Sequence, residues 1–207
     1  LARFGLLRPS FIPPEDLREL RLLSRRRMKL QGMLAGEKNR LHKTLDDAGI
    51  RLGSVVSDIN GVSARAIIDG LIDGMSPLQL MNFVRGRLKD KIPVLLDALD
   101  GSLSERHLFV LRHIRAHIRF LEQELQDIDL YLLAAMNPYR TQWEILQTIP
   151  GVDQISAAML IIEIGVDMKR FGSMERLASW AGMCPGNNES AGKRKSGRTR
   201  KGNRMVR

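Results

Sequence analysis

The sequence predicts an all-α protein in which long coiled-coil helices precede a small, helix-hairpin-helix-like C-terminal domain with a basic loop. Three observations support this fold class. Of the 207 residues, 43% are hydrophobic but only 5% are aromatic, and β-branched runs are few, which favours helices over a sandwich or barrel. Apolar residues recur three and four positions apart along two long stretches. Lys and Arg exceed Asp and Glu by ten, and nearly all of this excess is C-terminal.

The first long helix is predicted over residues 15–47. The preceding segment 1–14 contains three prolines, and we interpret it as a linker from a missing N-terminal domain. Arg27 and Glu37 interrupt the apolar seam of the helix, and Gly49 follows its expected end. The seam consists of leucines, namely Leu20, Leu23, Leu30, Leu34, Leu41 and Leu45.

Between residues 51 and 101 the signals become shorter. Asn60 and Gly61 predict a turn, and Ser63 is expected to begin a short helix. Ser76 and Pro77 supply the N-cap and the first-turn proline of another helix. We expect small helices here that pack together as a tip or platform.

The second long helix carries the most regular apolar pattern of the chain. Ser102 and Glu105 match a capping box, so the helix is predicted to begin at Leu103, and Asn137 and Pro138 end it. Its heptad seam predicts pairing with the first long helix, with another copy of the protein, or with both. A helical coiled-coil domain is therefore expected over residues 15–138. The seam comprises Leu111, Ile114, Ile118, Leu121, Leu125, Ile128 and Leu132.

No residue outside the C-terminal region is assigned chemistry. His113 and His117 lie one helical turn apart, but neither occupies the seam and no carboxylate or cysteine one turn away completes a metal site. The single cysteine, Cys184, excludes an internal disulfide and a zinc site made of cysteines. No secretory or membrane-spanning stretch is present, so we expect a cytoplasmic protein without a membrane partner.

Residues 139–207 are expected to form the C-terminal domain. A helix over 143–149, a turn at Gly151 and Val152 and a second helix over 154–164 follow the pattern of a helix-hairpin-helix, whose turn contacts phosphate through backbone N–H groups. Asp153 replaces the usual second glycine, and it would cap the second helix while placing an anion beside the phosphate. Contact with DNA and a purely structural helical hairpin therefore both stay open.

A short helix and a basic segment complete the domain. Ser173 is expected to cap a helix in which Leu177, Trp180 and Ala181 face inward and which Gly182 ends. Residues 191–207 contain eight Lys and Arg and no Asp or Glu. The preceding residues contain the other 25 of the 33 basic residues and all 23 acidic residues. A pI near 10.3 indicates a nucleic-acid partner, because neutralised phosphates release counterions. The DNA-binding candidates in this segment are Gly192, Lys193, Arg194, Lys195, Arg198, Arg200, Lys201 and Arg204.

Two stretches of this region, LQTIPGVDQISAAMLIIEIG and RFGSMERLASWAGMCPGNNESAGKRKSGRTRKGN, resemble the C-terminal domain of the IS one-ten family of insertion-sequence transposases, the Piv/MooV-type or DEDD recombinases. The opening stretch, LLRPSFIPPEDLRELRLLSRRRMKLQGMLAGEKNRLHKTLDDAGIRL, resembles the segment between that family's two catalytic domains.

The resemblance implies a division of labour among three regions. In the family, a RuvC-like domain with four acidic residues binds divalent metal such as Mg, a coiled-coil region follows, and a serine of the C-terminal domain links covalently to DNA. Several members are guided by a structured noncoding RNA. Carried onto this sequence, the motif serine is Ser190, and Gly192, Lys193 and Arg194 shape and charge its loop. Without the acidic domain, the chain is expected to hold no cofactor and to be inactive alone.

Three functions follow from these patterns. The first is a transposase or recombinase fragment that binds DNA and carries the serine nucleophile for strand cleavage and exchange, with self-association through the coiled coil. The second is a non-catalytic helix-hairpin-helix module that binds nucleic acid, and the third is a coiled-coil assembly protein. The E-S-A-G-K motif favours the first, because neither binding nor assembly needs a hydroxyl there.

Overall fold

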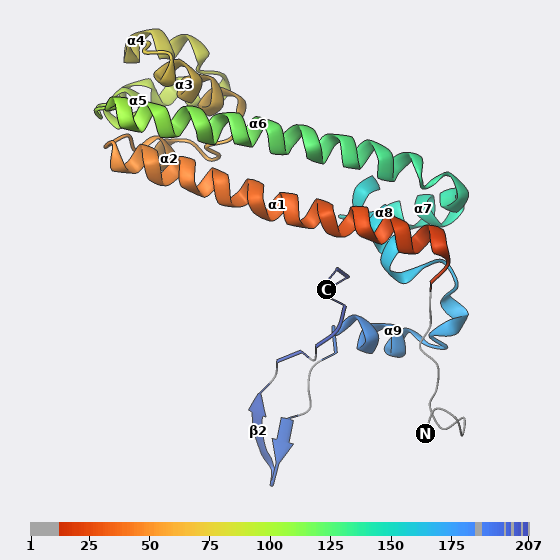
Figure 1. Ribbon diagram of the computed structural model, residues 1–207. Coiled ribbons are helices and arrows are strands. Elements are labelled where there is room, and N and C mark those ends of the chain that lie inside the picture. Colours follow the sequence, from red (N-terminus) through yellow and green to blue (C-terminus); the bar gives the residue numbers. More distant parts are fainter. Residues whose placement is uncertain (1–12, 185–187, 197, 200, 204, 207) are drawn as a thin grey trace. The chain divides into compact units, whose positions relative to one another are not determined.

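The computed structural model describes residues 13–184, 188–196, 198–199, 201–203 and 205–206. Nearly all regular structure in these residues is helical, which confirms the all-α prediction, and two short strands lie near the C-terminus (Figure 1). The chain divides into two compact units. Unit 1 contains residues 1–28 and 126–207, and unit 2 contains residues 29–125, so the boundary falls within helices α1 (Glu15–Asp47) and α6 (Glu105–Ala134). None of the described helices has the length and hydropathy that crossing a bilayer requires.

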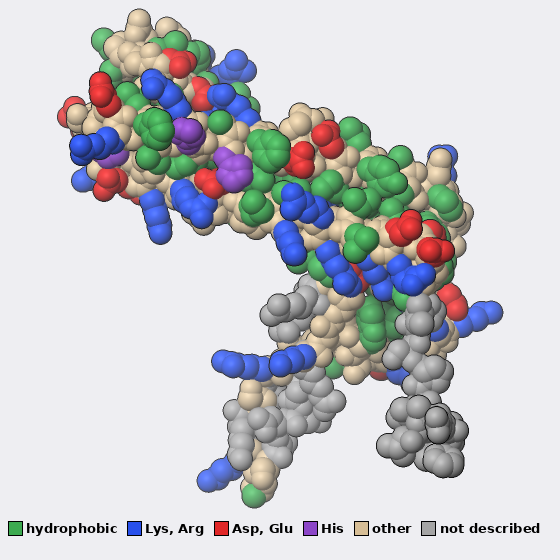
Figure 2. Space-filling model, in the orientation of Figure 1, with side chains coloured by type: hydrophobic (Ala, Val, Ile, Leu, Met, Phe, Trp, Pro, Cys, Tyr) green, Lys and Arg blue, Asp and Glu red, His purple; other side chains and the backbone are tan. Residues whose placement is uncertain are grey.

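In unit 2, α1 and α6 lie side by side and antiparallel (Figure 1). The predicted seam of α6 is buried at Leu111, Ile118 and Leu121, and the first two share one core with Leu41 and Leu45 of α1. The chain therefore fills the seam with its own side chains. On the face drawn in Figure 2, basic, acidic and hydrophobic side chains are interspersed over the two helices.

The two charged residues that interrupt the seam of α1 both have partners. In unit 2, Glu37 is only 9% exposed, and its Oε1 accepts a hydrogen bond from Arg40 (2.6 Å) and lies 3.1 Å from Nδ1 of His117 on α6. In unit 1, Arg27 donates two hydrogen bonds to the carboxylate of Asp129 on α6. Because a polar residue in a seam is tolerated only opposite its partner, these pairs fix the register of the helices.

Helix α6 begins at Glu105, so the predicted Ser102–Glu105 capping box is wrong. The cap is Ser104, whose Oγ accepts a hydrogen bond from the N–H of His107 while Nδ1 of His107 accepts one from the N–H of Ser104, both at 3.2 Å. Ser102 instead donates its N–H to the carbonyl oxygen of Ala48 at 3.0 Å. This tertiary contact holds Ser102 at the end of α1, out of reach of the first turn of α6.

The expected small helices pack on one end of this pair. They are α2 (Leu52–Val55), α3 (Val62–Ile72), α4 (Pro77–Leu80) and α5 (Ile92–Ala98), with 3₁₀ turns η2 (Met81–Phe83) and η3 (Gly86–Lys91) between α4 and α5. Ser76 caps α4 and Pro77 stands in its first turn, as predicted, and the structure adds a capping box between Ser76 and Gln79. The N-cap of α3 is Gly61, so this helix begins one residue before Ser63.

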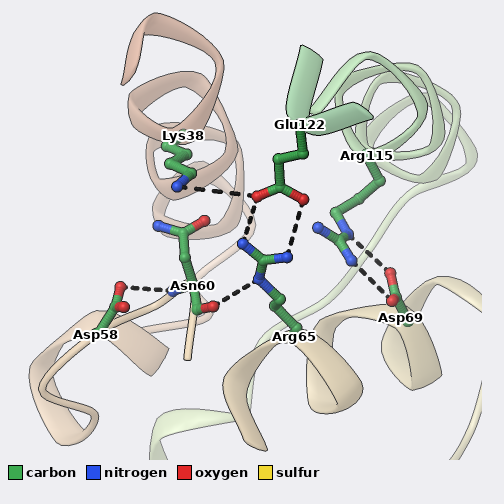
Figure 3. A network of polar contacts seen from close by, with 7 residues as sticks. All are labelled: Lys38, Asp58, Asn60, Arg65, Asp69, Arg115 and Glu122. Carbon is green, nitrogen blue, oxygen red and sulfur yellow. Dashed lines mark hydrogen bonds and ion pairs between the residues drawn. The ribbon is translucent and has the colours of Figure 1, made fainter. Parts of the chain in front are cut away.

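A polar network ties α3 to α6 inside unit 2 (Figure 3). Arg65 of α3 binds the carboxylate of Glu122 and the carbonyl oxygen of Asn60. Arg115 of α6 is 4% exposed and donates two hydrogen bonds of 2.8 Å to Asp69 of α3. Burial alone would raise the pKa of Asp69, but the hydrogen bonds and charge of Arg115 outweigh it and lower the pKa. The carboxylate therefore stays charged beside its buried partner.

Unit 1 has its own core, in which Leu17 and Leu20 of α1 pack with Leu132 of α6, with Met136 just after this helix, and with Ile162 of α8. After α6, the chain forms η4 (Asn137–Tyr139), α7 (Arg140–Gln147), α8 (Gln154–Ile164), η5 (Met168–Arg170) and α9 (Met174–Ala181). Strands β1 (Asn188–Ser190) and β2 (Lys193–Ser196) follow.

Candidate serine site and nucleic-acid interface

The E-S-A-G-K motif forms a β-hairpin rather than the predicted loop. Strands β1 and β2 pair antiparallel, with Ser190 opposite Lys193, so that only Ala191 and Gly192 form the turn. Their φ angles are 53° and 75°, and two consecutive positive φ values are typical of a type I′ turn, which matches the twist of paired strands. Nothing lies within 4 Å of a Cβ built on Gly192, so the backbone conformation and not crowding favours glycine there.

The turn presents Ser190 at the tip of the hairpin. Ser190 is exposed, and no other described residue forms a hydrogen bond with its hydroxyl. Because directly opposite residues of an antiparallel pair point to the same face, the ammonium-bearing side chain of Lys193 extends from the same face as Ser190. Ser196, in the K-S-G run six residues later, is the other serine of the hairpin, and its Oγ accepts a hydrogen bond from the N–H of Arg198 at 3.2 Å. The two serines thus differ in the hydrogen bonds that their hydroxyl oxygens accept from described residues.

The segment that carries the hairpin begins and ends beside the C-terminal end of α9. It leaves after Gly182 at the end of α9, and Gly202 packs back against the same point. A Cβ on Gly202 would lie 2.3 Å from the nitrogen of Gly182 and 2.4 Å from the carbonyl carbon of Ala181, so only glycine allows this approach. The N–H of Asn203 donates to the carbonyl oxygen of Trp180 at 3.4 Å. The two ends of the segment are thus held together at its base.

Glu163 of α8 anchors this base from within unit 1. It is 1% exposed, and its Oε2 accepts a hydrogen bond of 2.9 Å from Nδ2 of Asn203. Two arginines of α1 compensate the buried charge: Nε of Arg25 lies 3.4 Å from Oε1, and Nε of Arg21 lies 3.7 Å from Oε2. Arg21 also donates to the carbonyl oxygens of Ile162 and Glu163 at the end of α8. We did not single out Glu163 from the sequence, although an acid in so apolar a helix is a detectable signal.

The predicted DNA-binding cations are only partly described. Lys193, Arg198 and Lys201 are exposed, and no carboxylate among the described residues forms an ion pair with any of them. For Arg194 and Lys195 the structure describes only the backbone, which forms part of β2. Arg200 and Arg204 lie outside the described residues. Cations without carboxylate partners are available to bind phosphates, so Lys193, Arg198 and Lys201 are suited to bind a polyanion.

Comparison with known families identifies this region. Residues 143–207 match the model of a family described as Transposase IS116/IS110/IS902 family. Residues 143–207 belong to this transposase family. The matched range holds α8, α9 and the hairpin, together with all the site residues predicted from the sequence. Comparisons with curated proteins and with solved structures gave no match. The family description gives the matched residues a transposase character, which implies DNA as the partner of this region.

The transposase region also contains most of the helical hairpin of α7 and α8, from Trp143 onward. Asp153 caps α8, and a 2.7 Å hydrogen bond from the N–H of Ser156 to Oδ1 lowers the pKa of this carboxyl, which confirms the predicted cap. Gly151 is exposed with a φ of 87°, but Val152 donates its N–H to the carbonyl oxygen of Ile149 at 3.0 Å. Two N–H groups that a phosphate would use are thus occupied, and contact between this turn and DNA stays a prediction.

Helix α9 of the transposase region has the predicted caps but a different inner face. Ser173 Oγ accepts a hydrogen bond from the N–H of Arg176, and Gly182 ends the helix with a φ of 79°. Ala181 is buried, whereas Trp180 is 40% exposed, so the prediction that it faces inward is wrong. The rings of Trp180 and Phe171 pack in a T-shaped arrangement, with centroids 5.5 Å apart.

The divalent metal implied for the family has no candidate site in the described part of the chain. No group of three or more His, Cys, Asp or Glu side chains there has the geometry to hold a metal ion. The described residues of this chain therefore do not fit a metal ion.

Proposed function

We propose that this chain is part of a DNA transposase in which Ser190 is the nucleophile of strand cleavage. The observation that carries the proposal is the tight turn that exposes Ser190 beside Lys193 within the transposase region. A hydroxyl at the end of a narrow two-stranded projection can approach a phosphodiester without a clash from the helices behind it. The fastened base at Gly202 and Asn203 limits how far this projection moves.

The chemistry is a transesterification. Oγ of Ser190 attacks phosphorus, a serine–phosphate ester bond forms, and one bridging phosphorus–oxygen bond of the DNA breaks. The serine proton is lost, and the departing sugar oxygen takes up a proton to become a hydroxyl. Lys193 stabilises the negative charge that grows on the phosphate oxygens. Because one phosphodiester replaces another, the linkage can be reversed onto a second DNA end, which suits strand exchange.

The basic segment supplies the hold on DNA in this proposal. Contacts from Lys and Arg to phosphates position the duplex without reading its sequence, so target choice must come from elsewhere. A structured RNA, which the resemblance implies as a guide in several family members, presents the same phosphates and would be held by the same cations.

A covalent adduct tests the assignment. In an active transposase preparation that contains this chain, Ser190→Ala should eliminate the protein–DNA adduct, because no other hydroxyl occupies the tip of the hairpin. DNA affinity should stay within about threefold, a change of under about 1 kcal/mol. Denaturing gels with labelled DNA measure the first quantity and fluorescence anisotropy the second.

Ser196→Ala is the matched control and should keep the adduct. An adduct recovered from the Ser190→Ala protein, or mapped to Ser196 by mass spectrometry, contradicts the assignment. If the unaltered protein binds DNA but never forms an adduct, the non-catalytic binding module is the better account.

A further inference from the structure

A cavity of about 380 Å³ opens in unit 2, between the α2–α3 connection and η3. Its apolar lining comes from Val55, Val56, Ala64 and Leu88, which belong to segments that approach one another only in the folded chain. Its volume lies in the range of sites for small molecules or for one unit of a polymer. The cavity lies outside the residues that match the transposase family.

Three cations line this cavity, namely Arg85, Arg87 and Lys91. All three are exposed, and within the described residues no carboxylate pairs with any of them. The one acid in the lining, Asp58, turns back to accept a hydrogen bond of 2.8 Å from the N–H of Asn60. Three positive charges and one negative charge give the lining a formal charge of +2. A concave site with apolar walls focuses such a charge and attracts anions.

Other cations of unit 2 are used differently. Arg65 and Lys38 both contact Glu122, and Arg115 is bound to Asp69, so these charges are compensated inside the protein (Figure 3). The cavity cations have no such structural task among the described residues. The backbone places them, because the N–H of Arg85 donates to Oγ of Ser63 and holds the start of η3 against α3. The cavity thus presents uncompensated cations on a fixed frame.

We propose that this cavity binds one nucleotide phosphate of a nucleic-acid strand. Arg85, Arg87 and Lys91 hold the phosphate oxygens, and Val55 and Leu88 cover the adjoining sugar. The first turn of α3 lines the same cavity, and its N-cap Gly61 has no side chain to cap it, so this helix end adds partial positive charge. The chain then contacts nucleic acid at two places, the basic segment of unit 1 and this cavity of unit 2.

The chemistry of the lining favours a phosphodiester over an acidic peptide. A guanidinium group forms two parallel hydrogen bonds to phosphate, and two arginines with a lysine offer more donors than a single carboxylate can use. The lining contains no aromatic side chain on which a base would stack, so the contact reads phosphate and sugar. Binding here is therefore expected to be insensitive to base sequence.

Paired charge-reversal variants of the whole chain test the proposal. Arg87→Glu with Lys91→Glu alters the cavity, and Lys43→Glu with Arg106→Glu makes the same charge change at exposed positions of unit 2 outside it. With a fluorescein-labelled thymidine 12-mer as probe, anisotropy should show at least a fivefold greater loss of affinity for the cavity variant than for the control. The magnitude of the salt slope should also fall by about 0.7, the contribution of one phosphate of a single strand, in the cavity variant only. Circular dichroism melts confirm that both variants fold.

Photo-crosslinking locates the contact directly. A 12-mer with 4-thiothymidine should label the peptides that contain Val55–Ala64 or Arg85–Lys91 in the unaltered chain and in the control, and lose this label in the cavity variant. Equal affinity losses for the two variants, or no crosslink to these peptides, overturn the proposal. Competition by polyglutamate as strong as that by the 12-mer would instead assign the site to an acidic peptide. Equal competition by thymidine monophosphate would assign it to a free nucleotide. Ser190 takes no part in this measurement, so its outcome is independent of the proposed cleavage.

Discussion

At the scale of single residues, the candidate site depends on side chains that hold the hairpin base as much as on Ser190. Asn203 reaches a carboxylate that is almost completely buried, and hydrogen bonds to a charged group contribute more than those between neutral groups. Glu163 in turn keeps its charge because Arg21 and Arg25 face it. The segment that carries Ser190, the proposed nucleophile, is therefore held by residues that lie far from Ser190 in the sequence.

Asn203→Ala should loosen the serine-bearing segment without unfolding the helices. Losing a hydrogen bond to a buried carboxylate costs about 1.5–3 kcal/mol, which corresponds to tenfold or more in the population of the opened segment. Limited trypsin digestion should cleave after Lys193 or Lys201 at least several times faster, while the thermal midpoint of the helical signal changes little. Asn39→Ala, at an exposed position of α1, is the control. Unchanged cleavage would show that the side chain of Asn203 does not hold the segment, and that Gly202 packing and the backbone bond to Trp180 are sufficient.

At the scale of elements, both long helices are amphipathic and bury their seams against other parts of the chain. Leu121 is fully buried in unit 2, and Leu132 is fully buried in unit 1. Aspartate at Leu121 is therefore expected to unfold the helical pair rather than to separate copies of the protein. Self-association stays a prediction, and it would have to use apolar side chains that α6 leaves exposed, such as Phe109 and Phe120.

Helix α8 should show a pH-dependent cap. The hydrogen bond from the N–H of Ser156 lowers the pKa of Asp153, so its stabilising effect is complete above the ordinary carboxyl pKa of about 3.9 and is lost as the pH falls through the lowered value. Asp153→Ala should cost about 1 kcal/mol at pH 7. Thermal unfolding at pH 7, 5 and 3 measures how this difference shrinks in acid.

Asp153→Asn separates the cap from its charge. Asparagine accepts the same hydrogen bond but does not titrate, so this variant should match the unaltered chain at pH 7. At the lowest pH it should be the more stable of the two. A difference between Asp153→Ala and the unaltered chain that is constant with pH would mean that Asp153 does not act as a charged cap.

At the scale of the whole molecule, charge is divided between compensated and uncompensated cations. In the helical parts, many Lys and Arg face Asp or Glu, as the arginines paired with Asp69, Glu122, Asp129 and Glu163 do. From Ala191 onward the sequence contains eight Lys and Arg and no acid. The hold on nucleic acid should therefore depend strongly on salt, with a slope of log affinity against log salt of roughly −4 to −7.

Replacing Lys193, Arg198 and Lys201 together by Gln should reduce the magnitude of this slope by about three, because each phosphate contact contributes about 0.9. The matched control replaces Arg26, Lys29 and Lys43, three exposed cations of α1, by Gln and should leave the slope unchanged. Anisotropy titrations at salt concentrations from about 50 to about 300 mM measure the salt slopes of both variants. Equal reductions in the two variants would mean that total charge and not the C-terminal segment governs binding.

The sequence by itself determined the features that depend on near neighbours along the chain. Helix α1 has the predicted bounds, and Ser76, Asp153 and Ser173 are the caps that their spacing predicted. Helical periodicity and capping are local, since they join residues within about four positions. The E-S-A-G-K motif likewise pointed to Ser190 through local pattern and resemblance, although its two-residue turn was not recognised as a hairpin.

Only the tertiary structure decided what depends on distant partners. Ser104 rather than Ser102 caps α6, because Ala48 binds Ser102 from the end of α1. Glu163 became part of the site because Arg21 and Asn203, 142 and 40 residues away, converge on it. The cavity of unit 2 likewise exists only where two distant segments pack together. Burial and convergence depend on which surfaces meet in space, and local spacing carries no information about that.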